Sequence, residues 1–260
     1  MISILDRIVK DKKREVNFKK SVISKKQLEH SDLFSRKTIS LAEKLKQSRS
    51  GIIAEHKRRS PSKPEINNTL NVEDVAIGYQ KSGVSGMSVL TNGKYFGGSL
   101  NDLLLARASC TLPLLRKEFI IDEYQIIESK SYGADAILLI AAILSKQEVE
   151  QFSKLAKSLD LDVLLEVHNK EELQGIVTTH IDMIGVNNRN LKTFDVSLNT
   201  SKSLSSIIPD NVVKVSESGI HDTETIKMLQ SYGYQGFLIG ENFMKTNDPG
   251  VSAYNFINAL

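Results

Sequence analysis

From residue 51 onward, short apolar runs alternate with segments whose apolar residues recur at helical spacing, about every 20 to 30 residues. This alternation is typical of parallel strands joined by crossover helices. The run 136–140 (AILLI) has no polar position, so both of its faces should be buried, whereas a strand with one face in water would alternate. The pattern predicts strands near 51–57, 86–91, 112–118, 134–140, 162–167, 183–187, 212–216 and 236–240.

The intervening segments predict helices, several of which follow residues that commonly cap a helix N-terminus: Asn71, Ser99, Ser145 and Asp222. A doubly wound open sheet could contain similar units, but it normally has a glycine-rich turn after its first strand. Here charged residues and proline follow Ile53. Eight such units predict an α/β fold, a closed (β/α)8 TIM barrel. The helices are expected near 72–82, 99–109, 122–132, 146–159, 170–178, 200–207, 222–232 and 249–258.

The first 50 residues differ from the rest in charge. They hold 14 Lys and Arg against 6 Asp and Glu, a formal charge of +8, although the whole chain carries only +3. A basic arm that binds nucleic acid is one interpretation. The helical spacing of the apolar residues favours an amphipathic helix docked on the barrel, with its basic face in solvent. We therefore predict an N-terminal helical extension over 1–48 and a barrel over 49–260, together one domain. The apolar positions are Ile4, Leu5, Ile8, Val9 and Val16.

Composition narrows the class of protein further. A chain of 260 residues with 40% hydrophobic and 25% charged residues suits one large barrel. No stretch approaches the roughly 18 to 20 apolar residues of a membrane span, and Asp6 and Arg7 interrupt any signal-peptide core. We expect a cytoplasmic protein with no membrane or nucleic-acid partner. Cys110 is the only cysteine, which excludes an internal disulfide and a multi-cysteine metal site, and we predict no metal.

The first predicted strand ends in charged residues. Glu55 and Lys57 are two apart, so they share a face and meet at the strand end. A buried structural ion pair is the alternative, but burying both charges costs several kcal/mol unless all their hydrogen bonds are made, so a reactive role is favoured. The connection 58–71 is longer than usual and carries two prolines, which favours an active-site loop over a tolerated insertion. Its cations Arg58, Arg59 and Lys63 would attract an anionic substrate.

Other strands also end in ionisable residues. Lys117 ends the third strand, where desolvation and a neighbouring cation such as Lys57 should lower its pKa toward a useful acid range. Its neighbours Arg116 and Glu118 point the opposite way, out of the lumen. Glu166 and Glu217 end the fifth and seventh strands and can act as base or acid, whereas His168 is expected to be an ordinary polar residue past its strand.

Recognition groups follow the later strands. Asn187 and Arg189 share a face and suit a planar carboxylate, while Asn188 should point elsewhere. Backbone N–H groups of two glycine-containing turns, after the seventh and eighth strands, suit a phosphate. There Glu241 should bind through its main chain with its side chain turned away. Phe96, Phe119 and Leu138 either wall an aromatic substrate or pack as ordinary core.

Seven motifs resemble, in order, the signatures of the indole-3-glycerol phosphate synthase family. They are 52–62 (IIAEHKRRSPS), 95–99 (YFGGS), 115–119 (LRKEF), 165–168 (LEVH), 185–189 (GVNNR), 216–220 (SESGI) and 238–241 (LIGE).

The resemblance implies a (β/α)8 barrel of tryptophan biosynthesis. It would convert 1-(2-carboxyphenylamino)-1-deoxyribulose 5-phosphate to indole-3-glycerol phosphate with loss of carbon dioxide and water, without a cofactor. Lys117 would be the general acid. The implied catalytic residues are Glu55, Lys57, Lys117, Glu166 and Glu217; the substrate-binding residues are Ser60, Phe96, Phe119, Asn187, Arg189 and Ser218; the phosphate-binding residues are Ser218, Gly219, Gly240 and Glu241.

Two alternatives remain at this point. Another phosphosugar barrel, such as phosphoribosylanthranilate isomerase, would depend on a cysteine–aspartate pair, and Cys110 is not placed at a strand end. A catalytically silent barrel that acts as an assembly subunit would keep the apolar pattern but lose part of the charged set, which is complete here. The expected partner is a phosphorylated small molecule, and association with other tryptophan-pathway enzymes stays open.

Overall fold

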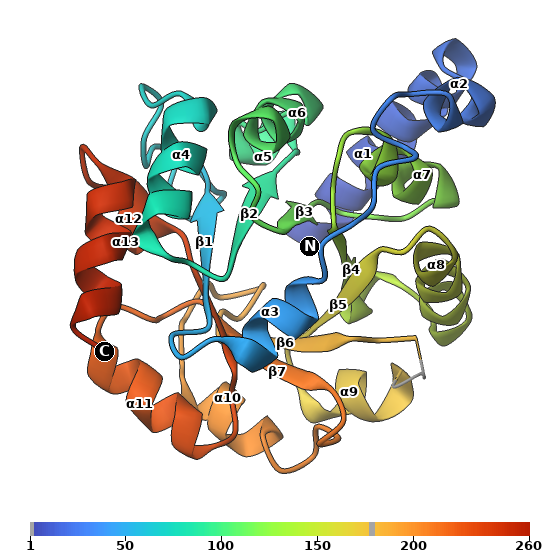
Figure 1. Cartoon of the computed structure of the whole chain (residues 1–260). Helices are drawn as coiled ribbons and strands as arrows, with labels where there is room; N and C mark the ends of the chain where they lie inside the picture. Colours follow the sequence, from blue (N-terminus) through green and yellow to red (C-terminus); the bar gives the residue numbers. More distant parts are fainter. Residues whose placement is uncertain (1–2, 177–179) are drawn as a thin grey trace.

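The computed structural model describes residues 3–176 and 180–260. Eight parallel strands form a closed barrel in sequence order, with the last strand pairing to the first (Figure 1). This confirms the predicted fold, and each observed strand overlaps a predicted one. The strands are β1 Ile52–His56, β2 Gly86–Leu90, β3 Leu114–Lys117, β4 Ala136–Ile140, β5 Asp162–Val167, β6 Met183–Asn187, β7 Val213–Glu217 and β8 Gly236–Ile239.

The crossover helices also lie where the sequence predicts them, although the end of the predicted helix 170–178 is outside the described residues. Ser99, Ser145 and Asp222 cap their helices through their side chains, as expected. Asn71 also occupies the N-cap position, as predicted, but its side chain makes no cap hydrogen bond. The helices are α4 Val72–Ser82, α6 Leu100–Ser109, α7 Glu123–Ser131, α8 Lys146–Ser158, α9 Lys170–Ile176, α10 Asn199–Leu204, α11 Thr223–Ser231 and α13 Pro249–Asn258.

Three short helices follow strands β2, β4 and β8 and have no counterpart in the sequence prediction. They are α5 Gly93–Phe96, the 3-10 helix η1 Ala141–Ile143 and α12 Glu241–Met244. Segments of three or four residues are too short to show a helical period. All three lie at the carboxyl end of the barrel, where they shape the surroundings of the site.

The segment before the barrel folds into helices α1 Ile4–Val22, α2 Lys25–Glu29 and α3 Leu41–Gln47. Helix α3 packs Leu41 and Leu45 onto lumen residues such as Ile53, which closes the amino end of the barrel (Figure 1). Helix α1 contacts α7, and its residues Ile4, Leu5 and Ile8 lie at the carboxyl end of the barrel. Because α3 closes the amino end, a substrate can reach the barrel only at the carboxyl ends of the strands. The boundary at residue 48 stays a prediction.

The buried face of α1 differs from the expected pattern at one position. Ile8 and Val16 are buried as predicted, but Lys12 is buried with them, only 2% exposed. The prediction that the basic face lies entirely in solvent is therefore wrong at Lys12. Within the two described ranges, no helix is long and apolar enough to cross a membrane.

Candidate functional site

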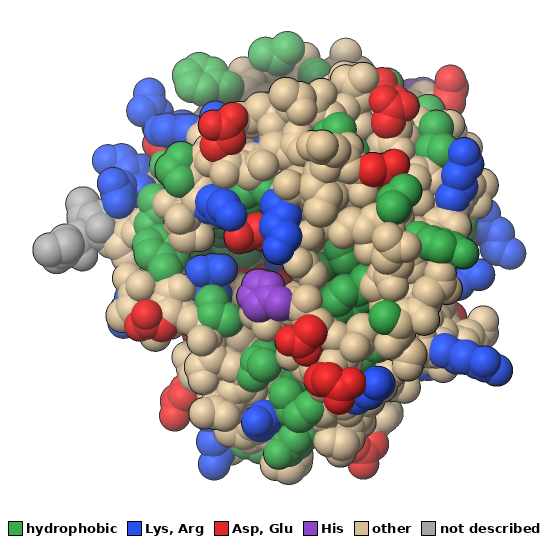
Figure 2. Space-filling model, turned by 90° about the vertical axis from the view of Figure 1, so that its left-hand side faces the viewer, with side chains coloured by type: hydrophobic (Ala, Val, Ile, Leu, Met, Phe, Trp, Pro, Cys, Tyr) green, Lys and Arg blue, Asp and Glu red, His purple; other side chains and the backbone are tan. Residues whose placement is uncertain are grey.

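A cavity of about 200 Å3 lies at the carboxyl ends of the strands. Strand-end residues, the loop after β1 and helix α1 all contribute to its lining. Figure 2 shows Lys and Arg side chains gathered around a hollow on one side of the molecule. The lining includes every residue that the sequence assigned to a site: Glu55, Lys57, Ser60, Phe96, Lys117, Phe119, Glu166, Asn187, Arg189, Glu217, Ser218, Gly219, Gly240 and Glu241.

Lys117 lies between two carboxylates at the centre of this cavity. Its Nζ is 2.6 Å from Glu166 Oε2 and 2.7 Å from Glu217 Oε2. The three strand ends thus bring together one ammonium and two carboxylates. No hydrogen-bond partner for Glu217 Oε1 is present among the described residues. The absence of a side chain at Gly185 on β6 makes room for this oxygen, because a Cβ there would lie 2.3 Å from it.

The two carboxylates have opposite protonation tendencies. Burial raises the pKa of Glu217 to about 7, because the nearby charge of Lys117 offsets burial only in part and Glu166 adds to the rise. Burial also opposes ionisation of Glu166, but there Lys117 and His168 outweigh it and lower the pKa. Near neutral pH, Glu166 is therefore ionised while Glu217 exchanges its proton. Two carboxyl groups whose surroundings separate their pKa values are suited to acid and base roles.

The prediction that the pKa of Lys117 is lowered is wrong. Burial does disfavour its charge, but Glu166, Glu217 and Glu55 outweigh burial and raise the pKa. The expected neighbouring cation is itself neutralised, since Lys57 Nζ pairs with Glu55 Oε1 at 2.6 Å. Lys117 is thus a firmly protonated donor in the free protein.

The Glu55–Lys57 pair lies beside this cluster. Ser88 Oγ donates to the other oxygen of Glu55 at 3.3 Å, and Lys57 remains 20% exposed toward the cavity. Gly240 permits the close approach, because a Cβ there would lie 2.6 Å from Glu55 Oε1. Glu55 is buried, but Lys57 is partly exposed and can reach an anionic ligand.

His168 takes a larger part than the sequence analysis expected. Its Nε2 lies 3.3 Å from Glu166 Oε1 and its Nδ1 lies 3.2 Å from Glu172 Oε2. Burial disfavours its protonation, but the two carboxylates raise its pKa to about 10. The spacing of two residues from Glu166 is the signal that could have placed both side chains on one face.

Asn187 connects the carboxylate cluster to the loop after β7. Its Nδ2 donates to Glu166 Oε1 at 3.3 Å, and its Oδ1 accepts from Ser218 Oγ at 2.9 Å. The Arg189 guanidinium is held by the carbonyl of Phe194 at 3.0 Å. Asn188 points away from the cavity to Ser201 and Ser216, as predicted.

The two turns assigned to phosphate follow the neighbouring strands β7 and β8, and both line the cavity. Ser218 and Gly219 have positive φ angles of 68° and 79°, so the backbone turns sharply after β7. The Glu241 carboxylate pairs with Lys63 Nζ at 2.6 Å, and this ion pair joins the loop after β1 to the loop after β8. His221 and Asn242 also line this part, and the sequence analysis missed both.

Apolar side chains form the other wall. The Phe96 and Phe119 rings lie 6.0 Å apart between centroids, beside Leu138. The sequence analysis missed a further contribution, because Ile4, Leu5 and Ile8 of α1 also line the cavity. A planar apolar group therefore fits between α1 and the barrel.

Some cations of the loop after β1 anchor the loop, whereas another lines the cavity. Arg58 donates two hydrogen bonds to Asp102, at 2.7 and 2.8 Å, and Arg59 donates to backbone carbonyls of α5. Both anchor the loop and do not line the cavity, whereas Lys57 does. In the described part of the chain, no three His, Cys, Asp or Glu side chains are arranged to hold a metal ion.

Comparison with known proteins decides the family. The family model described as indole-3-glycerol phosphate synthase matches residues 5–256, and the protein of that name from Bacteroides thetaiotaomicron is 46% identical over the full length of both chains. The chain belongs to the indole-3-glycerol phosphate synthase family. Indole-3-glycerol phosphate synthase of Albidiferax ferrireducens is 40% identical over 97% of each chain, and that of Bordetella pertussis is 43% identical over 81% of this chain and 80% of its own.

Solved structures outside the indole-3-glycerol phosphate synthase family share the fold. Thiamine phosphate pyrophosphorylase from Pyrococcus furiosus superposes with a TM-score of 0.60 at 13% identity, covering 85% of this chain and 97% of its own. Tryptophan synthase subunit alpha from Legionella pneumophila gives 0.58 at 14% identity, over 84% and 94%. At such identities the likeness concerns the barrel alone.

Proposed function

We propose that this chain catalyses the ring closure of 1-(2-carboxyphenylamino)-1-deoxyribulose 5-phosphate to indole-3-glycerol phosphate, as a carboxy-lyase of tryptophan biosynthesis. The observation that carries the proposal is Lys117 held by Glu166 and Glu217 in a cavity with one apolar and one polar wall, in a member of this family.

The two walls suit the two ends of this substrate. The aromatic ring fits between Phe96, Phe119 and helix α1, where apolar contact and ring stacking stabilise it. The phosphate fits the turns 218–219 and 240–241, where backbone N–H groups and glycine permit close approach. Lys57, Asn187 and Arg189 then lie near the carboxylate of the ring. Binding both ends places the ketone beside Lys117.

In the first step, the ring carbon that bears the carboxylate attacks the ketone carbon, and the ketone oxygen takes a proton from Lys117 Nζ. A raised pKa does not prevent this transfer, because an alkoxide forming on the substrate is a stronger base than an amine. Glu166 and Glu217 stabilise the ammonium before transfer and hold its position. The bond to the carboxylate then breaks, carbon dioxide leaves, and its electron pair restores the aromatic ring.

Dehydration completes the reaction. The new hydroxyl accepts a proton and leaves as water, while a base removes a proton from the neighbouring ring CH2, so that the double bond of the indole forms. Glu166, ionised in the free protein, is the proposed base. Glu217, with a pKa of about 7, is suited to hold the exchanging proton, and the Glu55–Lys57 pair lies close enough to assist.

Neither sequence alternative has a specific observation in its favour. Cys110 is buried at the end of α6, away from the cavity, and burial raises the pKa of its thiol, so it does not suit the isomerase mechanism. The charged set is complete and converges, which a silent barrel would not need. Association with other pathway enzymes and a cytoplasmic location stay predictions from the sequence.

A fluorescence assay tests the proposal. Purified protein incubated with the carboxyphenylamino substrate should produce the fluorescence of the indole product, and inorganic phosphate should compete. Substituting Lys227, an exposed residue of α11 paired to Glu224, provides the control and should leave the rate unchanged. Absence of product from folded protein that nevertheless binds the substrate would refute the proposed activity.

A further inference from the structure

The charged side chain of Lys12 on helix α1 is buried against the outer side of the barrel. Lys12 Nζ lies 2.7 Å from Glu15 Oε2 on the same helix and 3.1 Å from Glu118 Oε2, and both Lys12 and Glu118 are 2% exposed. A lysine is almost never fully buried unless it is paired. The Glu15 side chain is 41% exposed, so Glu118 is the buried carboxylate that compensates the charge of Lys12.

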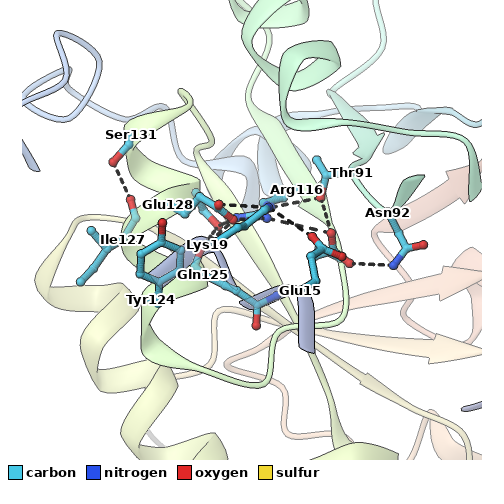
Figure 3. A network of polar contacts seen from close by, with 12 residues as sticks. Glu15, Lys19, Thr91, Asn92, Arg116, Tyr124, Gln125, Ile127, Glu128 and Ser131 are labelled. Atoms are coloured by element: carbon cyan, nitrogen blue, oxygen red, sulfur yellow. Dashed lines mark hydrogen bonds and ion pairs between the residues drawn. The ribbon is translucent and has the colours of Figure 1, made fainter. Parts of the chain in front are cut away.

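Glu118 joins three segments at once. Its Oε2 accepts from Thr91 Oγ1 at 2.9 Å, and its Oε1 accepts from the backbone N–H of Phe119 at 2.9 Å and from Asn92 Nδ2 at 3.4 Å. The carboxylate thus ties the end of β3 to the residues that follow β2. Thr91 and Asn92 are shown within this network in Figure 3.

These segments carry the reactive lysine and the aromatic wall. Lys117, Glu118 and Phe119 are consecutive in the chain, and all three line the cavity. Asn92 also caps α5 by accepting from the backbone of Tyr95, one residue before Phe96. Displacing the Glu118 carboxylate would therefore shift Lys117 and the aromatic side chains that line the cavity.

The other neighbour of Lys117 is also connected to α1. Arg116 Nη2 pairs with Glu128 Oε2 at 2.7 Å, and Glu128 Oε1 pairs with Lys19 of α1 at 3.1 Å (Figure 3). Helix α1 therefore holds both residues that flank Lys117, one through Lys12 and one through Lys19. These two connections hold the carboxyl end of β3 from the outer side of the barrel.

We propose that Lys12 is a positioning residue, which through Glu118 holds Lys117 and Phe119 in the reactive geometry. Replacing a buried ion pair with apolar side chains often leaves stability unchanged or raises it, so stability alone is a weak reason for a buried pair here. Reaction rate is more sensitive, because a displacement of about 1 Å can lower it about a hundredfold. The inference rests on the proposed function, since its readout is turnover of the same substrate.

The test compares Lys12→Met, Glu118→Gln and the double variant with the unmodified protein. Lys20→Met is the matched control, because Lys20 lies on the same helix in an exposed ion pair with Asp122. Urea unfolding gives stability, and kcat and KM are measured where each variant is folded. We expect Lys12→Met to lower kcat at least about tenfold, more than it changes KM, and Lys20→Met to stay within about twofold.

The double variant separates positioning from stability. It removes both charges, so no uncompensated charge is left buried and the resistance to urea should return toward that of the unmodified protein. Under our proposal kcat stays low, because the ion pair between Lys12 of α1 and Glu118 is lost, although the Lys19–Glu128 pair remains. Recovery of kcat together with stability, or normal kcat in folded Lys12→Met, would overturn the positioning role while leaving the proposed function intact. An inactive unmodified protein would overturn both.

Discussion

Both faces of strand β3 carry charged side chains, but the charges are fully hydrogen-bonded on the outer face and only partly so on the lumen face. On the outer face, Arg116 makes hydrogen bonds to Thr91, Gln125, Ser129 and Glu128, and it is almost completely buried. On the lumen face, one ammonium serves two carboxylates, and an oxygen of Glu217 has no hydrogen-bond partner in the described part of the chain. Complete satisfaction fixes a structure, whereas incomplete satisfaction leaves groups that can bind and exchange protons.

The largest expected effect is on the lumen face. Lys117→Ala should lower turnover by roughly two to four orders of magnitude with substrate binding largely kept, because a positioned acid is lost. Lys117→Arg should not restore it, since guanidinium does not release its proton. Glu166→Gln should also lose activity although its shape is nearly preserved. Steady-state kinetics with the indole fluorescence assay measure all three, and near-normal turnover in Lys117→Ala would remove this lysine from the mechanism.

Substitutions on the outer face of β3 should lower the free energy of unfolding. Arg116→Met should lower the free energy of unfolding by about 3 kcal/mol or more, because Glu128 loses a buried partner. Lys227→Met, which breaks an exposed pair, should change it by less than about 0.5 kcal/mol. Urea denaturation measures both. Equal effects of the two substitutions would mean that the Arg116 network does not stabilise the fold.

The strand pattern and the strand-end residues could be read from the sequence, because buried parallel strands are continuously apolar and side chains alternate with period two. The raised pKa of Lys117 could not, since it depends on Glu166 and Glu217, which are 49 and 100 residues away in the chain. The burial of Lys12 and the cavity contacts of Ile4, Leu5 and Ile8 depend on how α1 docks, and helical periodicity does not determine docking.

Protein stability and reaction rate should both depend on the protonation of Glu217 on the lumen face. The pKa of Glu217 is raised from 4.5 to about 7, so the fold favours its protonated form. Its stabilising contribution is complete below pH 4.5 and is lost as the pH rises through 7. Thermal unfolding should therefore show Glu217→Gln gaining stability relative to the unmodified protein between pH 4.5 and 7. The pH profile of kcat/KM, which reports groups of the free enzyme, should also lose its limb near pH 7 in this variant. An unchanged limb would assign that titration to another group.

The smallest effect is expected at His168, which supports Glu166 without lining the cavity. His168→Gln should lower kcat by less than about tenfold. The pKa of His168 is raised from 6.5 to about 10, so its charge stabilises the fold fully below pH 6.5, and this contribution is lost as the pH rises through 10. The stability lost in the variant should thus be larger at pH 6 than at pH 10.5. An equal loss at both pH values would show that His168 acts only through packing.

Carbon-13 NMR of labelled glutamate carboxyl groups tests the contrast between the two faces most directly. Glu217→Gln and Glu128→Gln assign one resonance on each face. We predict that Glu217 titrates near pH 7, because burial and Glu166 raise its pKa. Glu128 should titrate below the usual range, because Arg116 and Lys19 outweigh its burial and lower its pKa. If Glu217 titrated at or below 4.5 together with Glu128, the lumen face would be as fully compensated as the outer face, and the account of its chemistry would be wrong.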